Sequence, residues 1–276
     1  MARRQLRGRS SAQGAGAAIG GIALIFLALA ALGALALFYF SVTPKPRLDT
    51  ASLCPVDGPE GIIVVLVDTS DDLPQPAQRE VLGMLEDQIT ALPAYYKLDV
   101  RVLDIAGGRS RSLFSRCNPG DGTGLSEWTD NPRLARMRWL DDFRQPAKDA
   151  VKSSLSSASA KNSPIMGAIQ DIAIDQFSSS AAQKVEKKLI VISDMLEFTA
   201  LYSQYPGAGD LSYLRFKRSP AYLKFRTDLH EARVKIEYVQ QTQVTIDSVK
   251  HIEFWKEWIV DNRGVFDGAR RLQGAR

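Results

Sequence analysis

The fold is decided by the stretch Gly61-Ile-Ile-Val-Val-Leu-Val-Asp68, a continuous run of apolar, mostly β-branched residues that ends at an aspartate. Because apolar and polar residues do not alternate in this run, it predicts a strand that is buried on both faces. The stretch Lys188-Leu-Ile-Val-Ile-Ser-Asp194 repeats the pattern and also ends at an aspartate. Two such strands predict a parallel sheet with a polar site at the carboxyl ends of its strands.

Strands and helices alternate around these two runs. Further strands are predicted over residues 97–105, 110–117 and 234–239. Helices are predicted over residues 76–92, 133–157, 164–173, 219–232 and 249–262. The third of these helices begins at Pro164, with Ser163 as its N-terminal cap. The alternation predicts an α/β, Rossmann-like fold, in which a mostly parallel sheet carries helices on both faces.

An uncharged segment precedes this predicted domain. No charged residue occurs from Ser10 to Pro44, and residues 17–40 are almost entirely apolar. A helix of roughly 24 residues, rising ~1.5 Å per residue, is long enough to cross a ~30 Å hydrocarbon layer. Four arginines precede the run within the first nine residues, so the positive-inside bias places the N-terminus in the cytoplasm and the rest of the chain outside. A cleaved signal peptide is the alternative, although its apolar region is usually shorter.

The same four arginines explain the net charge of +4, because 31 basic residues then remain against 31 acidic residues. The body of the chain is therefore neutral, which argues against a nucleic-acid-binding surface. The chain has two cysteines and two histidines, which exclude a four-cysteine zinc site and a histidine-rich metal centre. We expect His230 and His251 to lie on helix surfaces.

These patterns predict a single-pass protein of the cytoplasmic (inner) membrane with an extracytoplasmic, periplasmic domain. Its predicted parts are a basic cytoplasmic N-terminus (1–15), a transmembrane helix (16–41), a linker (42–60), one α/β domain (61–262) and a flexible tail (263–276).

Oxygen-bearing side chains gather at the predicted carboxyl edge of the sheet. Asp68-Thr-Ser70-Asp-Asp72 follows the first buried strand, and Ser163 and Asp194 can reach the same point from neighbouring loops. Carboxylate and hydroxyl oxygens are the ligands that Mg²⁺, Mn²⁺ and Ca²⁺ prefer, so these five residues predict a divalent-cation site. Taken singly, an aspartate after a strand is also a common turn residue, and Ser163 is an adequate helix cap.

With these residues the chain resembles von Willebrand factor A-type domains that carry a metal-ion-dependent adhesion site, over roughly residues 61–262. The resemblance implies metal ligands at Asp68, Ser70, Ser163 and Asp194, with Ser163 in the place of the family's threonine. Asp72 stands where the family has a second serine, so its extra negative charge leaves open a degenerate, metal-free site. The segments 117–120 (Cys-Asn-Pro-Gly) and 254–258 (Phe-Trp-Lys-Glu-Trp) look like those of membrane-anchored bacterial relatives.

The resemblance also implies that the third strand is antiparallel at the sheet edge. Cys117 would then return to the side where Cys54 enters, on the face opposite the metal site. An exported location permits oxidation, so we expect a Cys54–Cys117 disulfide. On the chain-entropy model its loop would stabilise the fold by roughly 3–4 kcal/mol. Two buried free thiols are the alternative.

We expect a non-enzymatic interaction module that binds a protein partner, within an envelope assembly, through the rim of the cation site. Tyr202, Tyr205 and Tyr213 lie in a loop rich in glycine and proline and are candidate contact residues, unless the loop is a packed insertion with buried rings. The first alternative is a structural subunit with a vestigial site. The second is a Mg²⁺-dependent phosphohydrolase, although Ser70 stands where the haloacid-dehalogenase type needs an acidic residue, and the cationic groups that phosphoryl transfer needs are not evident.

Overall fold

The computed structural model describes residues 13–41, 45–70, 73–104, 106–127, 130–155, 162–205, 211–240 and 246–272. The chain divides into two compact units, Met1–Pro46 and Arg47–Arg276. In the first unit, residues Gln13–Ser41 form helix α1, whose described side chains are exposed. Among the residues described, no helix meets the length and apolarity needed to cross a membrane. The arginines of the first nine residues lie outside the described part of the chain.

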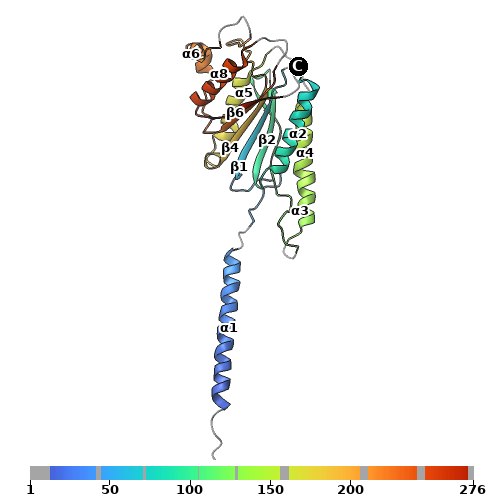
Figure 1. The fold of residues 1–276 in the computed structure, drawn as a ribbon, viewed down its shortest axis with the longest axis vertical. Coiled ribbons are helices and arrows are strands. Elements are labelled where there is room, and N and C mark those ends of the chain that lie inside the picture. The colour runs from blue at the N-terminus through green and yellow to red at the C-terminus, as the bar shows by residue number, and fades with distance from the viewer. Residues whose placement is uncertain are drawn as a thin grey trace, which may run out of the picture. The chain divides into compact units, whose positions relative to one another are not determined.

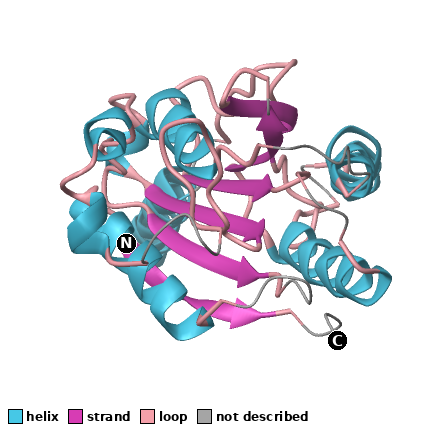
Figure 2. Cartoon of the chain, turned by 90° about the horizontal axis from the view of Figure 1, so that it is seen from above, coloured by secondary structure: helices cyan, strands magenta, loops and turns pink. Residues whose placement is uncertain are grey.

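The second unit is built on a six-stranded sheet (Figures 1 and 2), with strand order β3-β2-β1-β4-β5-β6. The strands are β1 (Gly61–Val67), β2 (Tyr96–Asp104), β3 (Arg109–Cys117), β4 (Glu186–Ser193), β5 (Arg233–Tyr238) and β6 (Val265–Arg271). All neighbours pair in parallel except β2 and β3, which are antiparallel. This arrangement confirms the predicted mostly parallel α/β fold and the antiparallel edge strand.

Helices cover both faces of this sheet, as Figure 2 shows. They are α2 (Gln75–Ala91), α3 (Pro132–Arg138), α4 (Gln145–Ser154), α5 (Ile165–Ile172), α6 (Tyr213–Phe216), α7 (Pro220–Lys224) and α8 (Ser248–Asp261). A π-helical segment, Trp139–Arg144, joins α3 to α4 without a break, and another, Ala173–Phe177, extends α5. A short 3₁₀ turn, Ala182–Lys184, precedes β4.

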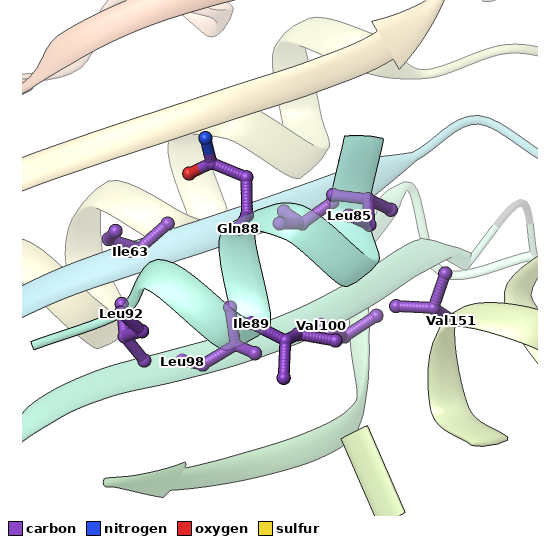
Figure 3. A pocket seen from close by; sticks show the side chains of 9 residues that line it. Ile63, Leu85, Gln88, Ile89, Leu92, Leu98, Val100 and Val151 are labelled. Atoms are coloured by element: carbon purple, nitrogen blue, oxygen red, sulfur yellow. The ribbon is translucent and has the colours of Figure 1, made fainter. Parts of the chain in front are cut away.

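Successive residues of β1 point to opposite faces and so divide the core in two. Val64 and Leu66 pack with α5 and α8, whereas Val65 and Val67 pack with α2 and α4. The α8 side carries the largest buried rings, those of Trp255 and Trp258. On the α2 side a small apolar cavity of about 10 Å³ remains between α2, α4 and the sheet, as Figure 3 shows.

Two predicted elements differ from the structure. The expected flexible tail instead forms strand β6, which pairs with β5, and Leu272 is buried. The expected helix over 219–232 ends at Lys224 with α7, and helix cannot extend to residue 232 because His230 and Glu231 adopt positive φ angles of 50° and 62° that no α-helix accommodates. Asn262 at the end of α8 accepts a hydrogen bond from the backbone N–H of Thr227 and so fixes this turn.

The segment before β1 belongs to the second unit, and the predicted disulfide is confirmed. Cys54 and Cys117 are joined, with their Cα atoms 4.7 Å apart. The backbone N–H of Cys117 also donates to the carbonyl of Ser52 at 2.8 Å. Cys117 lies level with Lys97 at the start of β2, so the bridge is at the amino end of the parallel strands, opposite Asp68.

Candidate functional site

The candidate site lies where the strand order reverses. β1 has β2 on one side and β4 on the other, and in doubly wound sheets ligands bind at the carboxyl ends of the strands that flank this point. Val67 pairs with Ile192, and the backbone N–H of Asp68 donates to the carbonyl of Ile192 at 2.9 Å. Asp68 and Asp194 therefore follow neighbouring strands at the same end of the sheet.

The buried carboxylate of Asp68 is the centre of a hydrogen-bonded cluster. Its Oδ1 accepts from the backbone N–H of Ser70 at 2.9 Å and from the Ser70 hydroxyl at 2.6 Å. Its Oδ2 accepts from the hydroxyls of Ser193 at 2.6 Å and Ser163 at 3.2 Å. Burial raises the pKa of Asp68, although the hydroxyl donors act in the opposite direction. The structure thus brings Ser70 and Ser163 to Asp68, as the sequence predicted.

Ser163 reaches Asp68 because it does not cap the following helix. The residue at the cap of α5 is Pro164, which offers no side-chain hydrogen bond, and the expectation of a serine cap is wrong. The N-terminus of α5 is capped instead by the carboxylate of Glu197, in the loop after β4. Its Oε2 accepts a hydrogen bond from the backbone N–H of Met166 at 2.8 Å. A carboxylate at a helix N-terminus is favourable because the free N–H groups carry partial positive charge.

Glu197 is the second buried carboxylate of the site. Burial, with a smaller contribution from the negative charge of Asp68, raises its pKa to about 8. Its Oε1 is buried and has no hydrogen-bond partner among the described residues. The site therefore holds two buried carboxyl groups whose ionised forms are disfavoured by burial, and a nearby cation would favour those ionised forms.

Of the remaining two predicted ligands, Asp194 is described and Asp72 lies outside the described residues. Asp194 is buried, and its Oδ1 accepts from the backbone N–H of Leu196 at 2.9 Å. Among the residues that are described, no group of three His, Cys, Asp or Glu side chains is arranged to hold a metal ion. The described groups that could contribute to a cation site include the Asp68 carboxylate and the hydroxyls of Ser70 and Ser163, which are oxygen ligands suited to Mg²⁺ or Mn²⁺.

A buried polar network connects the loop after β4 to helix α8. Gln204 accepts from the backbone N–H of Glu197 at 3.1 Å and lies 3.2 Å from Nε2 of His251, whose Nδ1 is 3.1 Å from the hydroxyl of Tyr238. The indole N–H of Trp255 donates to the carbonyl of Met195 at 2.9 Å. His251 is thus fully buried, which corrects its expected place on the helix surface, and burial lowers its pKa to about 4.

The candidate tyrosines occupy different environments. Tyr213 is only 6% exposed and its hydroxyl donates to Asp261 at 2.9 Å, so this ring belongs to the packed insertion that was the alternative. Tyr202 packs against Phe216, with ring centroids 4.8 Å apart. Tyr205 is half-buried and meets Phe198 edge to face at 5.4 Å.

Apolar side chains are exposed beside the candidate site. Phe198 is 37% exposed and Leu201 is 53% exposed. The backbones of Phe198 and Ser163 exchange two hydrogen bonds, at 2.9 and 3.0 Å, as an antiparallel bridge. Directly opposed residues of such a bridge project to the same face, so the side chains of Phe198 and Ser163 leave the backbone side by side.

Comparisons with known proteins add little to this geometry. No family model matches the chain, and no curated protein is significantly similar to it. A conserved hypothetical protein BatB from Bacteroides thetaiotaomicron is similar in shape, with a TM-score of 0.37 and 13% identity over 76% of this chain and 89% of that chain. An aerotolerance-related membrane protein from Bacteroides fragilis gives a TM-score of 0.35 and 13% identity over 78% of this chain and 92% of that chain. Similarity at this level carries no conclusion about the function of this chain.

The sequence did not point to two residues of the cluster, Ser193 and Glu197. Ser193 is the last residue of β4 and faces the same side as Asp68, a placement that follows only from the strand register. Glu197 comes three residues after Asp194 in an otherwise apolar stretch, Met-Leu-Glu-Phe. A charged residue between apolar neighbours is the one signal that could have marked it as buried and functional.

Proposed function

We propose that this chain is a membrane-anchored, non-enzymatic module of the bacterial envelope that binds a protein partner through the rim of a divalent-cation site. The observation that carries the proposal is the convergence of the Ser70 and Ser163 hydroxyls on the buried Asp68 carboxylate at the switch point of the sheet. Hard oxygen ligands at that place are suited to Mg²⁺ or Mn²⁺. The bound cation would present an open coordination position to a carboxylate of the partner.

The surroundings support a protein partner over a small substrate. Phe198 and Leu201 expose apolar surface beside the cluster, and exposed apolar side chains next to a polar centre are typical of interaction sites. No enzymatic role is proposed, since phosphoryl transfer needs cationic groups around the phosphate, whereas Asp68 and Glu197 make this site acidic. Release of product from a generic aryl phosphate, lost in Asp68→Asn, would contradict this part of the proposal.

Thermal unfolding with and without Mg²⁺ or Mn²⁺ tests the cation site. An ion present at about 100 times its Kd stabilises the folded state by about 2.7 kcal/mol, which corresponds to a rise of roughly 5–10 °C in Tm for a domain of this size. We expect the rise in the wild type and its loss in Asp68→Asn and Ser163→Ala. Ser110→Ala is the matched control, because Ser110 donates to another carboxylate, that of Asp171, at 2.6 Å. Equal, flat responses in all four proteins would end the cation hypothesis.

A structural subunit with a metal-free cluster is the second candidate. Its support is that Asp68 already accepts four hydrogen bonds, so the cluster is self-sufficient without an ion. The two candidates differ in partner capture, which cross-linking and mass spectrometry in native membranes can measure. Loss of cross-links in Asp68→Asn supports the cation rim, whereas unchanged cross-links support the structural role.

The anchoring is proposed from the apolar sequence of residues 17–40 and the four arginines before it. We propose an inner-membrane location with the N-terminus in the cytoplasm and residues 45–276 in the periplasm. Resistance of the chain to carbonate extraction and digestion of the domain by protease added to spheroplasts test both points. A mature chain that lacks its first residues by mass would indicate a cleaved signal peptide instead.

A further inference from the structure

Helix α3 has no buried side chain among its seven residues, although it continues through the π-helical segment into α4, which packs on the sheet. Leu134 is 44% exposed and Met137 is 58% exposed. Arg133 and Arg138 are also exposed, and the spacing of these four residues places them on one face of the helix. We call the surface formed by Arg133, Leu134, Met137 and Arg138 the α3 face.

The α3 face lies beyond the amino edge of the sheet. The guanidinium of Arg116, one residue before the end of β3, donates to the carbonyl of Asp142 at 2.8 Å, so Asp142 lies within reach of an arginine side chain from that edge. The ten helical residues from Pro132 to Asp141 precede this point and are about 15 Å long. Figure 1 shows α3 at this end of the second unit, below α4.

The chain enters the second unit at the same end. Cys54 is joined to Cys117 there, and the backbone N–H of Val56 donates to the carbonyl of Arg47 at 3.0 Å. Five residues separate helix α1 from Arg47, and five extended residues span at most about 18 Å. If α1 is held in a membrane, this end of the unit must stay near the membrane surface.

The charges of the α3 face are available to a ligand. Arg136 points away from it and pairs with Asp121 at 3.5 Å, with its guanidinium 5.6 Å from the Trp139 ring. Arg133 and Arg138 make no ion pair with any residue that the structure describes. Two free arginines beside two apolar side chains match the interface of an anionic lipid layer, where apolar groups enter the headgroup region and cations meet phosphates.

We propose that the α3 face docks on the anionic phospholipid surface of the membrane that holds the chain, and so fixes the orientation of the domain. This inference rests on the membrane anchoring proposed above and is independent of the cation site. Glu127 and Asp130 in the preceding loop, and the exposed Asp141 and Asp142 after the helix, reduce the local positive charge, so both the arginines and the apolar side chains contribute.

Hydrogen–deuterium exchange of the full chain in lipid nanodiscs tests the docking. Amides of a helix without buried side chains exchange through easy local opening, and docking would slow that opening. We expect exchange over residues 133–141 to be slower in phosphatidylglycerol than in phosphatidylcholine nanodiscs by roughly fivefold or more for each arginine engaged. Raised salt should reduce the difference.

Two double variants separate the contribution of the arginines from that of the apolar side chains, and a third double variant is the control. Arg133→Gln with Arg138→Gln should abolish the difference between the two lipids, and Leu134→Ser with Met137→Ser should weaken protection in both. Lys250→Gln with Lys256→Gln removes the same charge from exposed positions on α8 and should leave the difference intact. All substituted side chains are exposed, so folding should be preserved, which intact Cys54–Cys117 and the circular dichroism spectrum can verify.

Three other outcomes of the exchange experiment would overturn the docking. Equal exchange in the two lipids, in a chain that co-elutes with the nanodiscs, overturns the docking and leaves the anchor standing. Protection of α3 that persists in detergent without lipid means that protein covers the α3 face, which also overturns the proposal. A chain that does not co-elute with the nanodiscs contradicts the anchor and, with it, the docking.

Discussion

Replacing Glu197 by glutamine should change how the stability of residues 47–276 depends on pH. Burial raises the pKa of Glu197 from 4.5 to about 8. A group whose pKa is raised by folding contributes stability that is fully present below its unfolded pKa and is lost as the pH rises through its folded pKa. The contribution of Glu197 is therefore present below pH 4.5 and gone above pH 8. Glutamine cannot ionise, yet it keeps an acceptor for the backbone N–H of Met166.

The size of the effect follows from the pKa difference. One pKa unit corresponds to about 1.4 kcal/mol, so the whole shift is worth about 5 kcal/mol and the part between pH 6.5 and 8 is worth about 2 kcal/mol. The window from pH 6.5 to 8 is preferable because most of the titration of the buried His251 occurs at lower pH. The pKa of His251 is about 4 in the folded chain and 6.5 in the unfolded chain. The pKa of Asp68 is raised in wild type and variant alike, so any change in its ionisation is common to both proteins and largely cancels in the comparison.

Urea unfolding at pH 6.5 and 8, with a chelator to exclude divalent ions, measures this difference. The wild type should lose about 2 kcal/mol more than Glu197→Gln over the window. Glu257→Gln, at an exposed position of α8, should behave as the wild type. Equal losses in wild type and Glu197→Gln would refute the reasoning, because Glu197 would then titrate as it does in the unfolded chain.

Three further results are expected. Cys54→Ser should lower the free energy of unfolding by about 4 kcal/mol, and reduction of the wild type should reproduce most of that loss in calorimetry. His251→Gln should abolish a loss of about 3 kcal/mol that the wild type shows as pH falls from 6.5 to 4, since only the unfolded chain binds that proton readily. Val100→Ile should fill the cavity of Figure 3 and raise stability by about 0.8 kcal/mol, whereas a lower urea midpoint would mean that the cavity is too small.

Much of the fold could be predicted because its central strands are unambiguous. The unbroken apolar runs before Asp68 and Asp194 allow only buried strands, and two parallel neighbours must end at the same edge. Strand β6 was not predicted from the sequence. It lies at the sheet edge and pairs on one side only, and its sequence shows no pattern of apolar residues. The turn that follows α7 is held by the hydrogen bond from Thr227 to Asn262, a contact that no local pattern contains.

The candidate site was predictable in its residue types more than in its contacts. Asp68, Ser70 and Ser163 were found because they bear oxygen at strand and helix ends. The role of Ser163 was misjudged, since a serine before a helix normally caps it, and only the distant Glu197 makes that cap unnecessary. His251 could have been placed correctly, because it shares a helix face with Phe254, Trp255 and Trp258.

The disulfide determines how the domain carries mechanical load. Tension applied at Arg47 reaches Cys54 after seven residues and passes through the sulfur bridge to Cys117, at the end of the edge strand β3. β3 pairs with β2 in antiparallel register, so a force directed along β3 would load these hydrogen bonds in shear. The hydrogen bond between Val56 and Arg47 gives the force a second route, into the segment between Cys54 and β1. A force on Arg47 is therefore divided between β3 and the start of β1, both at the end of the sheet opposite Asp68.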